Sequence, residues 1–246
     1  MENYSALNEK EQEVQEMIKA GLHIGHQKSR GNPKMKPFIL MVKNGIQIIN
    51  TEKTYDNLKV ALDFIYKAVM DNKVILLLGT SPSAQESIVS IAKECDLPYV
   101  SNRWIGGIMT NYQVISKRID SYLNLENKKN TGALEKYTKK ERLRMTQLLE
   151  KLEIKFGGVK NLKRIPDIIF IVDVKKHKIA VDEAISKKID MVAVVDSDAD
   201  PSNIKYVIPA NDNARIAINY ILGKLKDTIL EAKKQKMVEA GKIKPQ

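Results

Sequence analysis

Cysteine and long apolar runs are scarce in this sequence. It has one cysteine, Cys95, so no disulfide can form within the chain, and its place in the helical pattern SIVSIAKEC indicates a small buried apolar residue. The longest apolar stretches, VILLLG and IIFIVD, are far shorter than the roughly 20 residues that a membrane-spanning helix needs. The first residues, MENYSALNEKEQEVQEM, show neither a signal-peptide nor a transit-peptide pattern. We therefore expect a cytoplasmic protein with no membrane partner.

Acidic residues are fewer than basic ones. The chain has 41 Lys and Arg against 30 Asp and Glu, which gives a net charge of +11. The excess is uneven: residues 117–164 hold 14 basic and 6 acidic residues, 165–213 hold 6 and 9, and 214–246 hold 8 and 3. An uneven positive excess favours a polyanionic partner, and a nucleic acid before an anionic membrane.

Nucleotide-binding and calcium-binding motifs are missing. GTSPSA has a single glycine where a dinucleotide fold needs Gly-x-Gly-x-x-Gly, and it lacks the end of a P-loop. Asp196, Asp198 and Asp200 resemble the start of a calcium loop, but the turn glycine and the bidentate glutamate of such a loop are absent. A magnesium site shared with Asp173 stays a weak possibility, and we predict no metal and no cofactor.

The three histidines have no identifiable catalytic or zinc partner. His23 and His26 could supply two zinc ligands from a helix, but Gly21 and Gly25 argue against helix there. His177 has no Ser or Cys in a recognisable nucleophile motif to activate. We therefore predict no catalytic residues and no small-molecule substrate.

Strand-like and helical patterns alternate along the chain. VILLLGT, IIFIVD and MVAVVD are typical of strands buried on both faces, and helical patterns separate them. This predicts a layered α/β domain with a parallel sheet, made of residues 1–109 and 157–232. It would include an N-terminal helix and a basic loop and hairpin at 21–50, with residues 233–246 forming a basic, flexible C-terminal tail.

Short local signals mark turns and helix starts. An Asn-Gly pair between FILMV and IQII predicts a β-hairpin. Three pairs have the spacing of a helix-starting cap or capping box: Asn8 with Glu11, Ser83 with Glu86 and Thr138 with Glu141.

The middle of the chain has a different pattern. From Tyr112 to Phe156 there is no strand pattern, and two helical stretches flank the polar break NLENKKNTGALEKY. Each stretch has a narrow apolar stripe, and the second ends at Gly157-Gly158. We therefore predict an antiparallel, coiled-coil helical hairpin at 110–156 that protrudes from the α/β core.

The stretch NRWIGGIMTNY lies where the chain leaves the core for this hairpin. We interpret it as a structural joint. Trp104 would pack at the base of the hairpin, and Gly106 and Gly107 would change the chain direction. Thr110 or Asn111 would be the N-cap of the next helix.

Several motifs run in one order along the chain: AGLHIGHQKSRGNPKMKPFI, TEKT, RWIGGIMTNY, FGGVKNLKRIPDIIFIVD, VVDSDADP and IPANDNA. Together they resemble the small ribosomal subunit protein two family over nearly the whole chain. The resemblance implies a flavodoxin-like core with a five-stranded parallel sheet and a protruding helical hairpin. It also implies a structural role in translation: binding small-subunit (16S) rRNA between head and body, and helping to dock ribosomal protein one. RWIGGIMTN and the basic hairpin resemble the bacterial and organellar branch, and without a transit peptide the bacterial cytoplasm is preferred.

The candidates for contacts with RNA phosphates are basic residues of four parts of the chain: the 28–43 segment, the joint, the hairpin and the hairpin's exit. The alternative for each residue is that it is merely exposed to solvent and contacts no RNA. They are Lys28, Arg30, Lys34, Lys36, Lys43, Arg103, Lys128, Lys129, Lys136, Lys139, Lys140, Arg142, Arg144, Lys160, Lys163 and Arg164. Two other functional classes stay open: an α/β enzyme acting on a phosphorylated substrate at the strand ends, and a free RNA-binding regulator.

Overall fold

A computed structural model describes residues 2–241, with side chains from Glu9 onwards. Its elements in chain order are α1 (Glu2–Lys19), β1 (Ile24–Gln27), η1 (Lys28–Arg30), η2 (Pro33–Phe38), β2 (Ile39–Lys43), β3 (Ile46–Ile49), α2 (Thr51–Met70), β4 (Ile75–Leu78), α3 (Pro82–Glu94), β5 (Tyr99–Val100), α4 (Tyr112–Asn130), α5 (Lys139–Phe156), η3 (Gly157–Val159), β6 (Ile168–Val172), α6 (Lys178–Lys187), β7 (Asp190–Val195), β8 (Tyr206–Pro209) and α7 (Arg215–Glu239).

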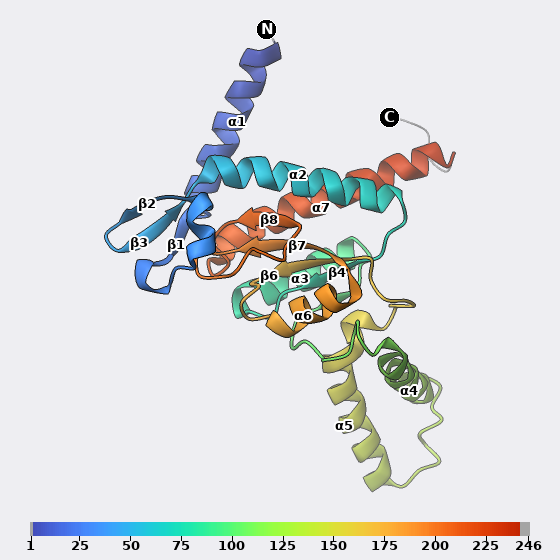
Figure 1. Ribbon diagram of the computed structural model, residues 1–246. Helices are drawn as coiled ribbons and strands as arrows, with labels where there is room; N and C mark the ends of the chain where they lie inside the picture. The colour runs from blue at the N-terminus through green and yellow to red at the C-terminus, as the bar shows by residue number, and fades with distance from the viewer. Residues whose placement is uncertain (1, 242–246) are drawn as a thin grey trace.

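The central sheet is parallel, with strand order β5-β4-β6-β7-β8. Strands β4 and β6 are buried along their whole length, as their continuous apolar sequences predict. Leu76 lies opposite Ile169, and Ile169 lies opposite Met191 on the other side. This five-stranded parallel sheet with flanking helices confirms the expected flavodoxin-like α/β fold (Figure 1).

Helices cover both faces of this sheet. Because consecutive strand residues point to opposite faces, Leu77 and Phe170 pack into one apolar layer with α1, α2, α3 and α7. Leu76 and Ile171 pack into the other layer with α4, α5 and α6. The base of the helical hairpin is therefore part of the second apolar layer.

A smaller antiparallel sheet, of order β1-β3-β2, projects from the side of the core (Figure 1). Asn44 and Gly45 both have positive φ angles, 50° and 78°, in the turn that pairs Lys43 with Ile46. The hairpin predicted from the Asn-Gly pair is confirmed. Strand β2 is a largely exposed edge strand.

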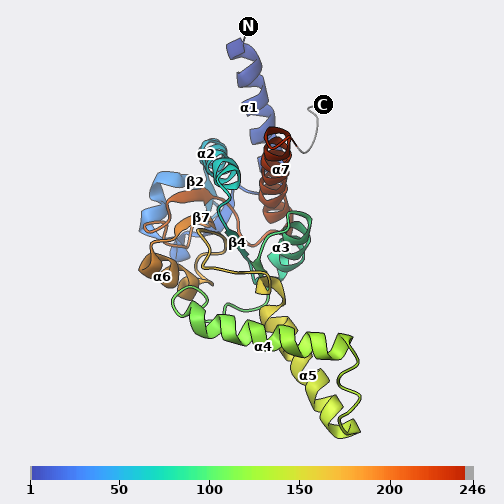
Figure 2. The ribbon, with the colours of Figure 1, turned by 90° about the vertical axis from the view of Figure 1, so that its right-hand side faces the viewer.

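Helices α4 and α5 cross near the base of the hairpin. In Figure 1 α4 is seen almost end-on while α5 lies in the plane of the view, and Figure 2 shows their far ends spread apart. Tyr122 of α4 donates its hydroxyl to Glu153 of α5 near the crossing. The coiled-coil packing expected from the apolar stripes is not confirmed, because both helices bury their bases against the sheet layer rather than only each other.

Only one of the three predicted helix starts is confirmed. Thr138 and Glu141 form the full capping box of α5. Helix α1 begins at Glu2, so Asn8 lies inside it and is not a cap. Ser83 lies inside α3, which begins at Pro82, so the box predicted there is also wrong. Proline at the first helical position, with its fixed φ angle, starts α3 instead.

The C-terminal segment corrects another expectation. Residues 233–239 form the end of α7, where Lys233 Nζ donates to the Cys95 carbonyl at 2.6 Å. Lys236 Nζ donates to the carbonyls of Val69 and Met70 at 3.1 and 3.0 Å. A flexible tail from residue 233 is therefore wrong for residues 233–239, because these lysines hold the helix on the core. Residues 242–246 lie outside the described residues.

Candidate nucleic-acid interface

The loop before α4 is organised around one buried carboxylate, Glu183 of α6. Its Oε1 accepts hydrogen bonds from Trp104 Nε1 at 3.0 Å and from the Gly107 amide at 2.8 Å. Its Oε2 accepts three, from the Met109 amide at 3.1 Å, the Thr110 amide at 3.1 Å and the Thr110 hydroxyl at 3.0 Å. All the hydrogen-bond donors to this carboxylate therefore belong to the joint that precedes the hairpin.

The environment of Glu183 favours its ionised form. Burial by itself raises the pKa of this carboxyl, but hydrogen bonds from Gly107, Trp104, Thr110 and Met109 outweigh burial, so the pKa is lowered from its usual value. The side chain is 7% exposed, and five donors satisfy its two oxygens. Glu183 was not predicted from the sequence, although a carboxylate on the same helix face as Ala180 and Ala184 is the pattern of a buried anion.

The remaining joint residues have distinct positions. Trp104 is buried and Arg103 is exposed. Gly107 has a φ angle of +97°, a conformation that favours glycine. Asn111 stands at the N-cap position of α4, but its side chain makes no capping hydrogen bond. The Thr110 hydroxyl binds Glu183 instead, so neither of the two expected side chains caps the helix.

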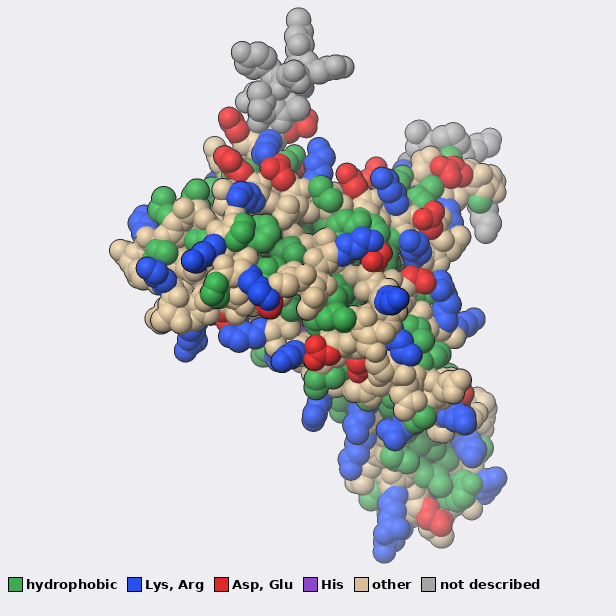
Figure 3. All heavy atoms as spheres, in the orientation of Figure 1, with side chains coloured by type: hydrophobic (Ala, Val, Ile, Leu, Met, Phe, Trp, Pro, Cys, Tyr) green, Lys and Arg blue, Asp and Glu red, His purple; other side chains and the backbone are tan. Residues whose placement is uncertain are grey.

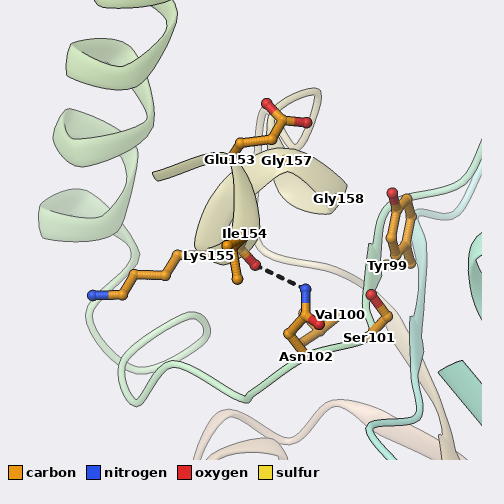
Figure 4. A pocket seen from close by; sticks show the side chains of 9 residues that line it. All are labelled: Tyr99, Val100, Ser101, Asn102, Glu153, Ile154, Lys155, Gly157 and Gly158. Atoms are coloured by element: carbon orange, nitrogen blue, oxygen red, sulfur yellow. Dashed lines mark hydrogen bonds between the residues drawn. The ribbon is translucent and has the colours of Figure 1, made fainter. Parts of the chain in front are cut away.

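A small pocket of about 50 Å³ lies behind the joint, between β5 and the end of α5 (Figure 4). Asn102 points across it and donates to the Ile154 carbonyl at 3.1 Å, whereas Lys155 points away. Ligand pockets usually have roughly 300 to 1,000 Å³, so this space does not fit a nucleotide. It marks the seam where the hairpin returns to the core.

Three of the sixteen basic candidates already have an acidic partner: Lys34 with Asp200 at 2.8 Å, Lys160 with Glu126 at 3.5 Å and Arg164 with Asp167 at 2.6 Å. The other thirteen are exposed and make no ion pair or side-chain hydrogen bond with the described part of the chain. They are Lys28, Arg30, Lys36, Lys43, Arg103, Lys128, Lys129, Lys136, Lys139, Lys140, Arg142, Arg144 and Lys163. Their charge is available to an external anion.

Seven of these exposed cations gather on the far half of the hairpin, which we call the distal cluster: Lys128, Lys129, Lys136, Lys139, Lys140, Arg142 and Arg144. Lys136 also lies over the Tyr137 ring, with its Nζ 5.5 Å from the ring centroid. The carboxylate of Glu141, which lies among them, is already hydrogen-bonded to Thr138. Figure 3 shows Lys and Arg side chains along the hairpin and over the small sheet, with Asp and Glu more frequent around α1. The two basic surfaces therefore lie at separate places on the molecule.

The acidic loop after β7 pairs with lysines. Asp198 binds Lys175 at 2.7 Å, and Asp200 binds Lys34 at 2.8 Å. The Lys34 hydrogen bond and those from Ser202 lower the pKa of Asp200 to about 2. Among the side chains that the structure describes, from Glu9 to Gly241, no group of three or more His, Cys, Asp or Glu is arranged to hold a metal ion. The weak magnesium possibility thus gains no support from the geometry.

Asp173, the fourth residue of that hypothetical site, accepts hydrogen bonds within its own turn. Its Oδ1 accepts from the Lys176 amide at 2.9 Å, and its carbonyl lies 2.6 Å from His177 Nδ1. His177 Nε2 lies 3.0 Å from the Thr80 hydroxyl, and burial lowers the pKa of this histidine. A neutral histidine with both nitrogens occupied is a structural link between strand-end loops and not a general base.

His26 lies against buried carboxylates and not in a zinc site. Its Nδ1 is 3.2 Å from Asp196 Oδ2 and 3.7 Å from Asp198 Oδ1. The Asp196 carboxylate beside it raises the pKa of His26, although partial burial acts against this. Burial and the neighbouring Asp196 charge raise the pKa of Asp212 to about 8. The contact of His26 with Asp196 links the basic 21–31 segment to the end of β7.

No helix within residues 2–241 is both long and apolar enough to cross a membrane.

The fold and its surfaces define a class: an α/β protein that carries basic surfaces on a helical arm and a small sheet. Residues 17–232 match the family model described as Ribosomal protein S2. The chain is 43% identical over 220 residues to small ribosomal subunit protein uS2 of Coprothermobacter proteolyticus, covering 89% of this chain and 82% of that protein. Proteins of the same name from Petrotoga mobilis and Geotalea uraniireducens are 42% and 41% identical, covering 89% of this chain and 76% and 85% of theirs.

The chain belongs to the ribosomal protein S2 family. The resemblance seen in the sequence motifs is confirmed, and the chain is a structural ribosomal protein rather than an enzyme. The alternative of an α/β enzyme acting at the strand ends is excluded accordingly.

Proposed function

We propose that this protein binds small-subunit (16S) rRNA between the head and the body of the subunit, in the bacterial cytoplasm. The distal cluster is the observation that carries this proposal. Its seven exposed cations have no acidic partner among the described residues. No internal ion pair therefore has to break when they neutralise phosphates. Because phosphate contacts position a protein without reading sequence, such a surface fits folded rRNA.

The basic segment before α2 supports contact at a second point. No acidic residue occurs from Ala20 to Thr51, and Lys28, Arg30, Lys36 and Lys43 are exposed there. This segment lies on the small sheet and its approaches, at a distance from the hairpin (Figure 3). Two separate basic surfaces suit a protein that joins two parts of one RNA.

The same proposal includes a role in docking ribosomal protein one, which rests on the family resemblance. A protein partner requires exposed apolar surface in addition to charge. Leu40, Met41 and Val42 on edge strand β2 are 59%, 53% and 44% exposed and supply such a surface.

Removing charge from the distal cluster tests the proposal. The variant Lys139→Gln, Lys140→Gln, Arg142→Gln and Arg144→Gln should reduce co-sedimentation with small subunits in sucrose gradients. For each phosphate that is no longer neutralised, the slope of log affinity against log salt should fall in magnitude by roughly 0.7 to 0.9. Probing the same fractions for ribosomal protein one measures docking.

The matched control replaces four exposed lysines outside the hairpin with Gln, so the net charge changes equally: Lys59 and Lys67 on α2, Lys73 in the loop before β4, and Lys93 on α3. The control should keep normal occupancy. Equal occupancy and slope in the two variants would refute the distal cluster as the RNA face. Failure of the wild-type chain to co-migrate with subunits in low salt would instead favour the free regulator.

A further inference from the structure

We propose that Glu183 is a positioning residue: its buried carboxylate sets the direction in which the hairpin leaves the α/β core. All five of its donors belong to the joint, between Trp104 and Thr110, and the acceptor belongs to α6. Helix α4 begins at Tyr112, two residues after the last donor. The carboxylate therefore fixes the chain immediately before the hairpin starts.

The arrangement requires an anion and not only a polar group. Oε1 accepts from two donors and Oε2 from three. In either orientation, the amide of a glutamine at position 183 would direct its NH2 group at two or more donors. Those donors would lose their acceptor inside the protein, and a buried donor left without an acceptor destabilises the arrangement that depends on it. A carboxylate is the side chain that satisfies all five.

Direction depends on these hydrogen bonds more than on the apolar contacts of the hairpin base. Ile115 and Ile119 of α4 are buried in the second layer and hold the base close to the core. Apolar contact has little directional preference, whereas a hydrogen bond weakens steeply as its angle departs from linearity. Five bonds to one rigid group restrict the rotation of the joint. Together with the proposed function, this means that Glu183 aims the distal cluster at its RNA.

Distance measurements between spin labels test the inference directly. Labels attached at Lys128→Cys on the hairpin and Lys67→Cys on α2 report the hairpin direction. The native Cys95 is fully buried, so the labelling reagent should not reach it. Wild type should give one narrow distance distribution by double electron–electron resonance. Glu183→Gln should broaden it at a temperature where circular dichroism shows the protein folded. The chain's one tryptophan, Trp104, should become more accessible to acrylamide quenching.

Asp182→Asn is the matched control, because Asp182 is the exposed neighbour on the same helix and the charge change is equal. It should leave the distances and the quenching unchanged. If Glu183→Gln does not fold, Glu183→Asp replaces it: the anion stays but moves by one methylene, so a narrow distribution with a shifted mean is expected. A folded Glu183→Gln with wild-type distances, or a Glu183→Asp with an unshifted mean, would overturn the proposal.

Measuring rRNA binding by the same variants separates this inference from the proposed function on which its biological consequence rests. Broadened distances with weaker small-subunit rRNA binding support both. Broadened distances with unchanged rRNA binding leave Glu183 as the positioning residue and contradict the RNA role of the hairpin.

Discussion

At the scale of single residues, the raised pKa values of Asp212 and His26, which both lie near Asp196, make stability depend on pH. Asp212 is 3% exposed, and burial beside Asp196 raises its pKa to about 8. In an unfolded chain an aspartate has a pKa of about 3.9. The folded protein therefore binds a proton that the unfolded chain releases, so this group's contribution is complete below about pH 4 and is lost as pH rises to about 8. The raised pKa of His26 acts in the same direction, and its contribution is lost as pH rises through the folded pKa.

Asp212→Asn should remove most of this dependence. An amide needs no proton to stay neutral, so the variant should gain stability over wild type by on the order of a few kcal/mol at pH 8 and by little at pH 5. Urea unfolding at the two pH values measures the difference. Asp63→Asn, at an exposed position on α2, is the control and should follow wild type. A gain of equal size at both pH values would show that Asp212 does not carry the proton.

At the scale of elements, two glycines at different places in the fold should respond oppositely to alanine. A Cβ on Gly158, just after α5, would overlap the carbonyl oxygen of Tyr99 and lie 2.8 Å from its ring. A Cβ on Gly223, inside α7, would meet no atom within 4 Å. Gly158→Ala should therefore lower the free energy of unfolding by about 1 to 3 kcal/mol. Gly223→Ala should raise it by about 0.5 to 1 kcal/mol.

Thermal and urea unfolding of the two variants check this pair. Loss of stability in both would mean that the open space beside Gly223 does not accommodate a methyl group. An unchanged free energy of unfolding in Gly158→Ala would show that α5 and β5 can move apart to fit the methyl group without loss of stability.

Elements whose signals are local were predictable from the sequence. The apolar runs of β4 and β6 predicted buried strands, and Thr138 with Glu141 predicted the start of α5 because both partners lie within one helical turn. Asn44 and Gly45 predicted a turn because both positions require positive φ angles.

Elements that depend on distant partners were not predictable. Asn8 has the spacing of a cap, yet helix continues through it, so spacing alone did not locate the start of α1. The apolar stripe of α5 has the pattern of a coiled coil, but Leu149 and Phe156 pack into the second layer of the sheet. Glu183 is 73 residues beyond Thr110, so the centre of the joint is visible only once the chain is folded. In the candidate interface, charge identified the basic residues, but their freedom from acidic partners required the structure.

At the scale of the whole molecule, burial is distributed unevenly between core and hairpin. Within residues 123–148 only Leu134 is buried, whereas β4 and β6 have no exposed residue. Local opening needs little energy where a segment buries little apolar surface. Amides of residues 124–147 should exchange with deuterium at least on the order of 100-fold faster than those of β4 and β6.

Adding small-subunit rRNA should slow exchange in the hairpin and leave β4 and β6 unchanged. Protection of the hairpin equal to that of the strands in the free protein would contradict the uneven stability inferred from burial.

The first turn of α1 and the last turn of α7 both lie at the end of the molecule opposite the hairpin in Figures 1 and 2. A purification tag or surface anchor attached at either terminus would therefore hold the protein with its basic arm facing the solution. Immobilised in this way, the same preparation could report RNA association in real time without masking the surface under test.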